Sequence, residues 1–328
     1  MLVTERSGTL KRLGANGSTL GTVAGVPAVA FAGQGGLLDI ALATDFASSR
    51  RLFLSFAETG SGGTSGLAVG TGVLSADGAS LAQWQVIFRQ LPKVASDNHF
   101  GGRIVVSGDG TLFVTAGDRQ LDTERGKAQD LSQGNGKVFR IAADGSVPGG
   151  NPFAATTGAQ PQIWTYGHRN PQGAALRPGT SQLWTSEHGP QGGDEVNLTQ
   201  PGLNYGWPNV SYGCEYGAPV GNCTPVGGAS TGPGYEAPKT YWVPTSIAPS
   251  GMAFYEGAGF PEWRGNLFIG ALAGTALWRI VLSGDTVVQR EALFSELGER
   301  IRDVRQGPDG WLYLVTDGGA GRVLRIER

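Results

Sequence analysis

Charge and long apolar runs are both scarce in this sequence. Only 16% of its 328 residues are charged, and the formal net charge is -2. A basic stripe of the kind that nucleic-acid-binding surfaces need is therefore missing. No apolar run approaches the roughly 18 residues that a membrane-spanning helix requires. We expect neither a nucleic-acid partner nor a membrane span.

Cysteine is equally scarce, with Cys214 and Cys223 as the only two. They flank one glycine-rich loop, CEYGAPVGNC, which favours a local disulfide in an exported protein. Two free thiols in a cytosolic protein are the alternative. A zinc site is disfavoured because no second pair of ligands lies nearby. The chain opens almost directly on the strand-like run LVTE and no signal peptide is visible, so we expect a mature or trimmed form.

Helical periodicity is nearly absent, and only short stretches such as EALFSELGER suggest a turn or two of helix. Elsewhere, turns alternate with strands of β-branched and aromatic residues. Four segments resemble one another: SGDGTLFVTAGD, RPGTSQLWTSEHG, WRGNLFIGALAG and GPDGWLYLVTDGG. Repeats of this kind, at about 40 to 50 residues per blade, predict a β-propeller. Long loops at 120–165 and 200–245 favour six blades, so we predict an all-β, six-bladed β-propeller forming one domain over residues 1–328.

One of the three histidines lies beside a predicted hairpin, in DNHFGGRIVVSGDGTLFVTAGDR. If Ser107 pairs with Thr111 across the turn, antiparallel pairing brings His99 next to Asp118. An aspartate that holds a histidine ring in one tautomer prepares a general base. A surface histidine beside a turn aspartate is the alternative.

Three further motifs carry candidate binding residues. The run HRNPQG places a guanidinium and two amides in one loop, which suits a planar, anionic, oxygen-rich ligand. The run EHGPQGGDE offers carboxylates and glycine carbonyls, the oxygen ligands that Ca²⁺ prefers. Arg300 and Arg302 alternate along a predicted strand and would form a two-pronged anion clamp. Turn chemistry and solvated charge are the alternatives.

Taken in order, these motifs resemble the soluble quinoprotein sugar dehydrogenases, the glucose/sorbosone dehydrogenase family, and within it the aldose sugar dehydrogenase branch. The matching runs are GQGGLLDIAL, DNHFGGRIVVSGDGTLFVTAGDR, GKVFRI, YGHRNPQG, SEHGPQGGDEVN, NYGWP, SIAPSGMAFY and RIRDV with GPDG. The resemblance implies a six-bladed propeller that binds PQQ and Ca²⁺. It also implies oxidation of an aldose at C1 to the lactone, with electrons passing to an external acceptor, in the periplasm or outside the cell.

The resemblance assigns roles to individual residues of this sequence. The implied catalytic group is the base His99, its orienting carboxylate Asp118, Gln34 near the C1 oxygen of the sugar, and Arg169 at the reacting quinone oxygen. The implied cofactor contacts are Arg169, Asn170, Gln172, His188, Ser246, Arg300 and Arg302. The implied calcium ligands are the carbonyls of Gly189 and Pro190, with Glu195 and the Tyr205 carbonyl at a second, structural site.

Two positions depart from the glucose enzyme of that family. His188 stands where that enzyme has a glutamine beside PQQ, and Ala273 stands where it has a PQQ-binding lysine. Two other functions remain open: a metal-dependent lactonase or hydrolase, and a non-catalytic binding propeller, since one fold hosts many functions. The preferred sugar and the electron acceptor are not fixed by the sequence, which also allows a monomer or a homodimer.

Overall fold

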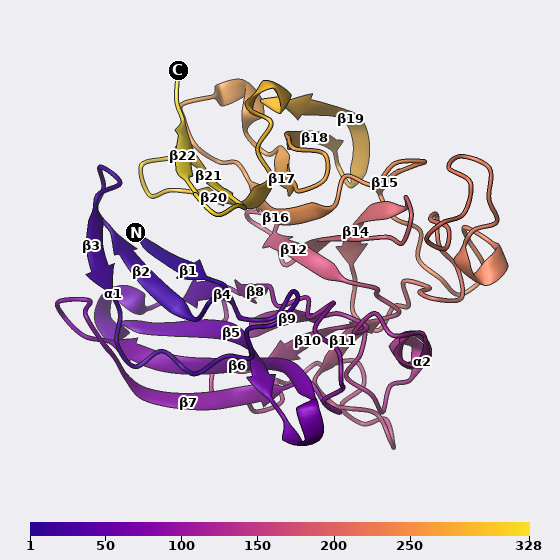
Figure 1. Ribbon diagram of the computed structural model, residues 1–328, viewed down its shortest axis with the longest axis horizontal. Coiled ribbons are helices and arrows are strands. Elements are labelled where there is room, and N and C mark those ends of the chain that lie inside the picture. The colour runs from indigo at the N-terminus through magenta and orange to yellow at the C-terminus, as the bar shows by residue number, and fades with distance from the viewer. The chain divides into compact units, whose positions relative to one another are not determined.

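The computed structural model describes residues 1–328, and strands make up nearly all of the regular structure (Figure 1). The strands form six antiparallel sheets of three or four strands, each built from strands that follow one another in the chain. Six such sheets are the blades of a six-bladed β-propeller, so the predicted all-β fold class is confirmed.

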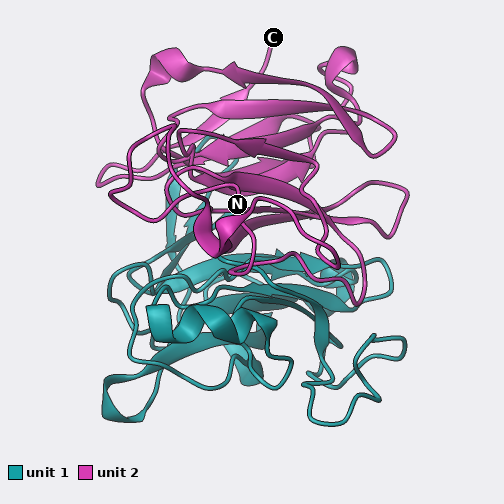
Figure 2. Cartoon of the chain, turned by 90° about the vertical axis from the view of Figure 1, so that its right-hand side faces the viewer, with its two compact units in different colours: residues 1–170 teal, residues 171–328 magenta.

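The chain divides into two compact units, residues 1–170 and 171–328 (Figure 2). Because each unit is described by itself, the prediction of a single domain stays a prediction. The first unit holds three sheets, and β1, β4 and β8 contact one another in turn. Its strands are β1 Leu2–Glu5, β2 Thr9–Leu13 and β3 Thr19–Thr22; β4 Leu37–Leu42, β5 Arg51–Thr59, β6 Ser65–Leu74 and β7 Leu81–Arg89; and β8 Ile104–Val106, β9 Leu112–Ala116, β10 Lys137–Ile141 and β11 Ile163–Tyr166.

The second unit also holds three sheets, and β12, β16 and β20 contact one another in turn. Its strands are β12 Pro171–Leu176, β13 Leu183–Glu187, β14 Asp194–Thr199 and β15 Thr240–Trp242; β16 Pro249–Phe254, β17 Leu267–Ala271, β18 Leu277–Ser283 and β19 Thr286–Leu293; and β20 Ile301–Gln306, β21 Leu312–Thr316 and β22 Val323–Ile326.

Helices are few and short. They are α1 Phe46–Ser49 and α2 Asp122–Arg125, with 3-10 turns at Ser61–Gly63, Gly126–Gln129, Val226–Gly228, Pro261–Trp263 and Ser295–Leu297. The suggestion of helix in EALFSELGER is wrong for its first residues, which complete β19. Pairing with β18 decides the conformation there, because Glu291 lies opposite Arg279 and forms an ion pair with it at 2.6 Å. Only one 3-10 turn follows.

Side-chain hydroxyl groups tie each sheet to the next within a unit. In the first unit, Thr4 donates to the Leu38 carbonyl at 3.0 Å and Ser55 to the Gly102 carbonyl at 2.5 Å. In the second, Ser186 donates to the Ser250 carbonyl at 3.2 Å, and the Ser250 hydroxyl donates to the Ile301 carbonyl at 2.6 Å. Each bond gives a hydrogen-bond partner to a backbone carbonyl between two sheets, where water cannot provide one.

Apolar side chains from neighbouring sheets fill the space between them. One cluster in the first unit joins Phe53 and Val69 of the second sheet to Val114 and Phe139 of the third. Strand β9, LFVTA, is buried on both faces, which explains why it reads as a continuous apolar run. This packing fixes the position of the loop that follows β9, where Asp118 lies.

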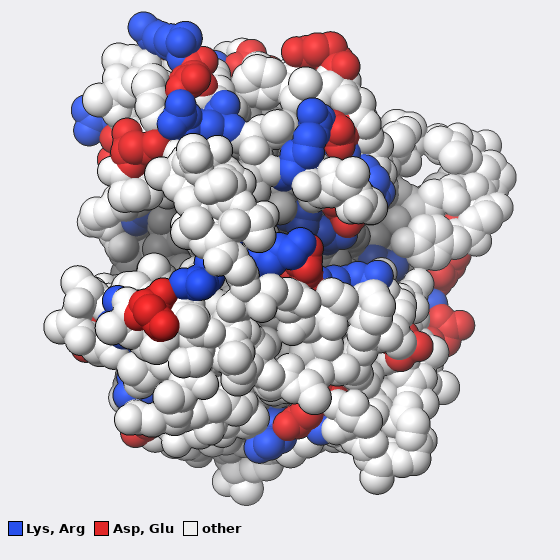
Figure 3. Space-filling view, turned by 60° about the vertical axis from the view of Figure 1, so that its left-hand side comes forward, with Lys and Arg blue, Asp and Glu red and all other residues white.

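Charged side chains on the face drawn in Figure 3 are scattered, with basic groups commonly beside acidic ones. Among the exposed ion pairs of the chain, Arg328 lies 2.9 Å from Glu262 and Arg325 lies 2.6 Å from Glu327. Exposed pairs of this kind contribute about 0 to 1 kcal/mol each, so they do not account for the fold. None of the helices is long and apolar enough to span a bilayer.

Candidate functional site

The hairpin of β8 and β9 has the pairing that the sequence predicts. Ile104 lies opposite Val114 and Val106 opposite Leu112, and the Ser107 amide donates to the Thr111 carbonyl at 2.8 Å. Continuing this register leads to the segment before β8 and the segment after β9. His99 and Asp118 lie next to each other there, as the predicted pairing around the turn requires.

His99 and Asp118 form a buried pair in the first unit. The distance from Nδ1 of His99 to Oδ1 of Asp118 is 2.7 Å, and the two residues are 4% and 1% exposed. The same oxygen accepts the Gln120 amide at 2.8 Å. A carboxylate at Nδ1 retains the proton on that nitrogen, which leaves Nε2 as the basic atom of the ring.

Burial and two nearby arginines favour the neutral form of His99. Burial lowers the pKa of His99, the hydrogen bond and charge of Asp118 raise it, and the positive charges of Arg169 and Arg119 lower it again, with a net lowering. For Asp118, burial raises the pKa, but the hydrogen bond and charge of His99 and the charge of Arg169 hold it below its usual value. A neutral imidazole beside an ionised carboxylate is a prepared general base.

The backbone around His99 is held in an unusual conformation. His99 has a φ of +48°, in the left-handed region that side chains with a Cβ rarely adopt. Its amide donates to the Gln34 side-chain oxygen at 2.9 Å, and the Gln34 amide donates to the Asp97 carbonyl at 2.7 Å. A Cβ on Gly117 would lie 2.2 Å from the His99 carbonyl oxygen, so only glycine fits there.

Arg169 and Asn170 complete the first cluster. The Asp118 amide donates to the Arg169 carbonyl at 2.8 Å, and the Gly101 amide donates to Asn170 Oδ1 at 3.2 Å. The Nδ2 group of Asn170 is buried without a hydrogen-bond partner. An orphaned buried donor is costly, and a bound ligand with acceptor oxygens would satisfy it. The first unit thus brings together Gln34, His99, Asp118, Arg169 and Asn170.

A second cluster lies in the second unit around the predicted arginine clamp. Arg300 and Arg302 both donate to one oxygen of Asp317, at 3.2 Å and 2.6 Å. Arg302 also donates to the Gln172 side-chain oxygen at 2.9 Å. Burial would raise the pKa of Asp317, but Arg302 and Arg300 hold it below its usual value. The two guanidinium groups thus point the same way, and Asp317 between them was not predicted from the sequence.

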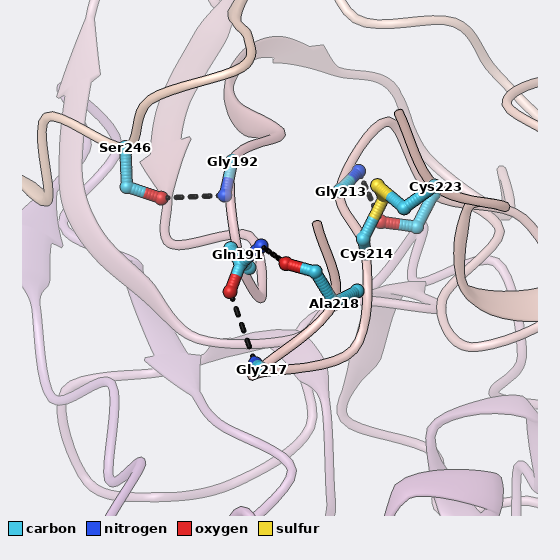
Figure 4. The surroundings of a disulfide bond; sticks show 9 residues. Gln191, Gly192, Gly213, Cys214, Gly217, Ala218, Cys223 and Ser246 are labelled. Carbon is cyan, nitrogen blue, oxygen red and sulfur yellow. Dashed lines mark hydrogen bonds between the residues drawn. A yellow bond between two sulfur atoms is a disulfide. The ribbon is translucent and has the colours of Figure 1, made fainter. Parts of the chain in front are cut away.

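The loop between β13 and β14 is held by Asp194 and Ser246. Asp194 accepts the amides of Gly189, Ile247 and Ala248, at 2.9, 2.7 and 2.7 Å. Ser246 accepts the Gly192 amide at 3.0 Å, as Figure 4 shows, and its hydroxyl donates to the Pro190 carbonyl at 3.3 Å. These bonds fix the carbonyls that the sequence suggests as calcium ligands. Nearby, a ring nitrogen of His188 lies 2.8 Å from the Pro249 carbonyl.

The predicted disulfide between Cys214 and Cys223 is formed, with a Cα–Cα distance of 6.2 Å. The ten-residue loop that it closes contacts the β13–β14 loop through Gln191 (Figure 4). The Gln191 side chain donates to the Ala218 carbonyl at 2.6 Å and accepts the Gly217 amide at 3.0 Å. The disulfide loop therefore braces the segment that contains Gly189 and Pro190.

Two carboxylates lie close together at the predicted structural calcium site. Asn197 donates to Glu187 at 3.1 Å and to Glu195 at 3.3 Å. Burial and the neighbouring charge of Glu187 raise the pKa of Glu195 well above its usual value. Asn197 Oδ1 is buried without a donor. A cation would relieve both features, so this oxygen-rich group fits Ca²⁺. In residues 1–328, no group of three or more histidine, cysteine, aspartate or glutamate side chains is arranged so that it could hold a metal ion by itself.

Ala273 provides no charge at the position where the glucose enzyme has a lysine. The residue is exposed, and its amide donates to the Ile247 carbonyl at 3.0 Å. The cationic groups of the two clusters are therefore those of Arg169, Arg300 and Arg302.

Comparison with known proteins identifies the family. A family model described as Glucose / Sorbosone dehydrogenase matches residues 1–325. The chain is 45% identical to the aldose sugar dehydrogenase YliI of Escherichia coli, over 100% of this chain and 86% of that protein. It matches a crystal structure of a glucose dehydrogenase with a TM-score of 0.94 and 48% identity, over 100% of this chain and 92% of the other. It also matches the structure of the PQQ-bound aldose sugar dehydrogenase of Streptomyces coelicolor, with a TM-score of 0.79 and 31% identity. This match covers 99% of this chain and 90% of the other.

The chain belongs to the glucose/sorbosone dehydrogenase family, a family of sugar-oxidising enzymes. The predicted resemblance is confirmed.

Proposed function

We propose that this protein oxidises aldose sugars at C1 to the corresponding lactones, with PQQ and Ca²⁺ as cofactors. The observation that carries the proposal is the buried pair of His99 and Asp118, which has the geometry of a general base. The family and the PQQ-bound relative support the same reaction.

The proton step belongs to His99. Nε2 accepts the proton of the C1 hydroxyl group while Nδ1 keeps its hydrogen bond to Asp118, which stabilises the imidazolium that forms. PQQ, when bound, would supply the hydride acceptor, so that loss of the C1–H hydride and of the O–H proton to His99 would together form the C1=O bond of the lactone. Gln34 orients the C1 oxygen of the sugar.

Each cluster has groups suited to contact the cofactor. PQQ is an organic anion with carboxylates, and charge-assisted bonds from arginine to such groups are strong. Arg300 and Arg302 together with Asp317 retain one net positive charge for this purpose. The Nδ2 group of Asn170 offers a donor without a protein acceptor. Arg169 would stabilise negative charge that develops on the quinone oxygen, and Gln172, His188 and Ser246 would make further contacts.

Calcium would bind at two places. The Gly189 and Pro190 carbonyls lie in a loop fixed by Asp194 and Ser246 and would hold the ion beside the cofactor. Glu195 and the Tyr205 carbonyl would hold a structural ion, where the raised pKa of Glu195 indicates a need for positive charge. The disulfide and the family support a periplasmic or secreted location, and an external acceptor would receive the electrons.

Reconstitution tests the proposal. Purified apo-protein receives PQQ and Ca²⁺ separately and together, and dye reduction is followed with a panel of aldoses. Turnover that requires both additions is the expected result. Lactone hydrolysis without PQQ would favour the hydrolase alternative. Absence of both PQQ binding and turnover would favour a binding propeller and overturn the proposal.

A further inference from the structure

Arg119, next to the candidate site, is a charged side chain with almost no exposure. It is 1% exposed and among the largest fully buried side chains of the protein. Its Nε donates to the Asn98 carbonyl at 2.9 Å, and its terminal nitrogens donate to the Ser65 carbonyl and hydroxyl at 3.0 and 3.2 Å and to the Ser96 carbonyl. Burying a charge is costly unless its donors are satisfied, and here the guanidinium meets a ready set of acceptors.

Arg119 contacts both neighbours of His99. It bonds the carbonyl of Asn98, the residue before His99. Its guanidinium also lies over the ring of Phe100, the residue after His99, with Cζ 3.7 Å from the ring centroid. Such cation–π contacts contribute most when they are shielded from water. The segment that carries the imidazole is therefore held on each side by one side chain.

The backbone conformation explains why such a clamp is needed. His99 has a φ of +48° and Arg119 a φ of +71°, and residues other than glycine hold such angles only when their surroundings impose them. The Arg119 carbonyl accepts the Ser96 hydroxyl at 2.6 Å, which joins the two strained segments a second time.

We propose that Arg119 is a positioning residue for His99: it fixes the segment 96–100 around the imidazole and so sets how the ring meets Asp118. This inference rests on the proposed role of His99 as the base. Lysine cannot replace arginine in this role, because the guanidinium is a planar fork with five donors and an ammonium group is a compact point charge. The carboxylates whose charges act on Arg119 are Asp97, Asp118 and Glu124.

The test compares Arg119→Lys and Arg119→Met with a matched control, Arg50→Met. Arg50 also has a positive φ, of 53°, donates to the Leu74 and Ser75 carbonyls, and has its guanidinium near an aromatic ring, that of Phe46. It lies outside the candidate site.

The first measurement is the ¹⁵N NMR spectrum of the histidine rings in apo-protein, which is tractable because the chain has only three histidines.

The expected result is a single His99 tautomer with the proton on Nδ1 in the wild type and in Arg50→Met, and a mixture of tautomers in both Arg119 variants. In reconstituted enzyme, kcat of the Arg119 variants should fall about 10- to 100-fold with the PQQ spectrum retained, a typical effect of a misplaced catalytic group. If Arg119→Met does not fold, Arg119→Lys carries the comparison.

Arg119 variants with one His99 tautomer and the kcat of the control would overturn the inference. The tautomer measurement needs no cofactor, so it separates the two proposals. If wild-type enzyme failed to oxidise sugars, the proposed function would fall, while the NMR result would still show whether Arg119 positions the His99 ring.

Discussion

Arg302 donates to Asp317 at 2.6 Å and to Gln172 at 2.9 Å, so one guanidinium joins β20 to the segment after β21 and to β12. These contacts hold the guanidinium in place before any ligand arrives, and such preorganisation reduces the entropic cost of binding.

Removal of the Arg302 charge is expected to weaken PQQ binding. Arg302→Met should raise the Kd of PQQ about 10- to 100-fold, because a charge-assisted hydrogen bond contributes about 1.5 to 3 kcal/mol. Titration of apo-protein with PQQ in the presence of Ca²⁺ measures this change. Arg305→Met is the control on the same strand, since Arg305 is exposed and pairs with Asp303. Equal Kd values in the two variants would rule out the clamp.

Loss of the imidazole of His99 is expected to stop the chemistry and spare the cofactor. His99→Ala should lower kcat by about 10²- to 10⁴-fold, the usual contribution of a general base. PQQ binding should remain, because the proposed cofactor contacts lie elsewhere. Absorbance of bound PQQ and single-turnover rates provide the two measurements. Near-normal turnover in this variant would show that another group takes the proton.

The pH profile should reflect the lowered pKa of His99. Because burial and the nearby arginines disfavour the imidazolium, the base stays neutral at pH values below the ordinary histidine value of 6.5. The acidic limb of kcat/KM should therefore lie below pH 6.5. In Asp118→Asn the attraction that favours the imidazolium is lost, so the limb should move to still lower pH while kcat falls. A limb above pH 6.5 in the wild type would contradict this prediction.

Lys137 is expected to stabilise the first unit. Its ammonium group is fully buried and donates to the carbonyls of Lys127, Ala128 and Asn135 at 2.9, 2.9 and 2.6 Å. Lys137→Met would leave these acceptors without their donor and should cost about 1 to 3 kcal/mol or more in the free energy of unfolding. Lys11→Met, which removes only a partly exposed ion pair with Glu5, should cost less than about 1 kcal/mol. Chemical denaturation compares them.

Lys137 should also affect the pH dependence of stability. Burial lowers its pKa from 10.5 to about 7. Between these two values the unfolded chain binds more protons than the folded chain, so this group makes stability rise with pH across that window. The rise should be smaller in Lys137→Met. An unchanged slope between pH 7 and 10 would mean that the ammonium group keeps its proton in the folded protein.

Calcium should stabilise the second unit through Glu195. Addition of Ca²⁺ to chelated apo-protein is expected to raise Tm, because an ion that binds only the folded state stabilises it. Glu195→Gln should lower the size of this shift, and the exposed Glu262→Gln should leave it intact. A calcium-dependent shift of equal size in Glu195→Gln would place the stabilising ion elsewhere.

The site is predictable from the sequence where it depends on the register of a single hairpin or on the spacing of residues within one loop. The pairing of His99 with Asp118 follows from the antiparallel register around the short turn between Ser107 and Thr111. The spacing of the two cysteines in CEYGAPVGNC favoured the disulfide that the structure contains. Contacts between distant segments escape this reasoning. The sequence gives no signal that Arg119 reaches Ser65, 54 residues away, or that Arg302 reaches Gln172, 130 residues away. Asp317 had a weak signal, because it lies near the end of the last repeated segment, in the run TDGG.

The serine and threonine hydroxyl groups that join successive sheets have a consequence for how mutations act. Each hydroxyl reaches only the adjoining sheet, so within a unit the stability resembles a sum of blade terms and nearest-neighbour terms. Ser250 takes part in two junctions, since its backbone carbonyl accepts from the fourth sheet and its hydroxyl donates to the sixth. Because the backbone carbonyl of Ser250 remains in any substitution, Ser250→Ala would remove only the bond to Ile301, and the loss would stay at the junction of the fifth and sixth sheets.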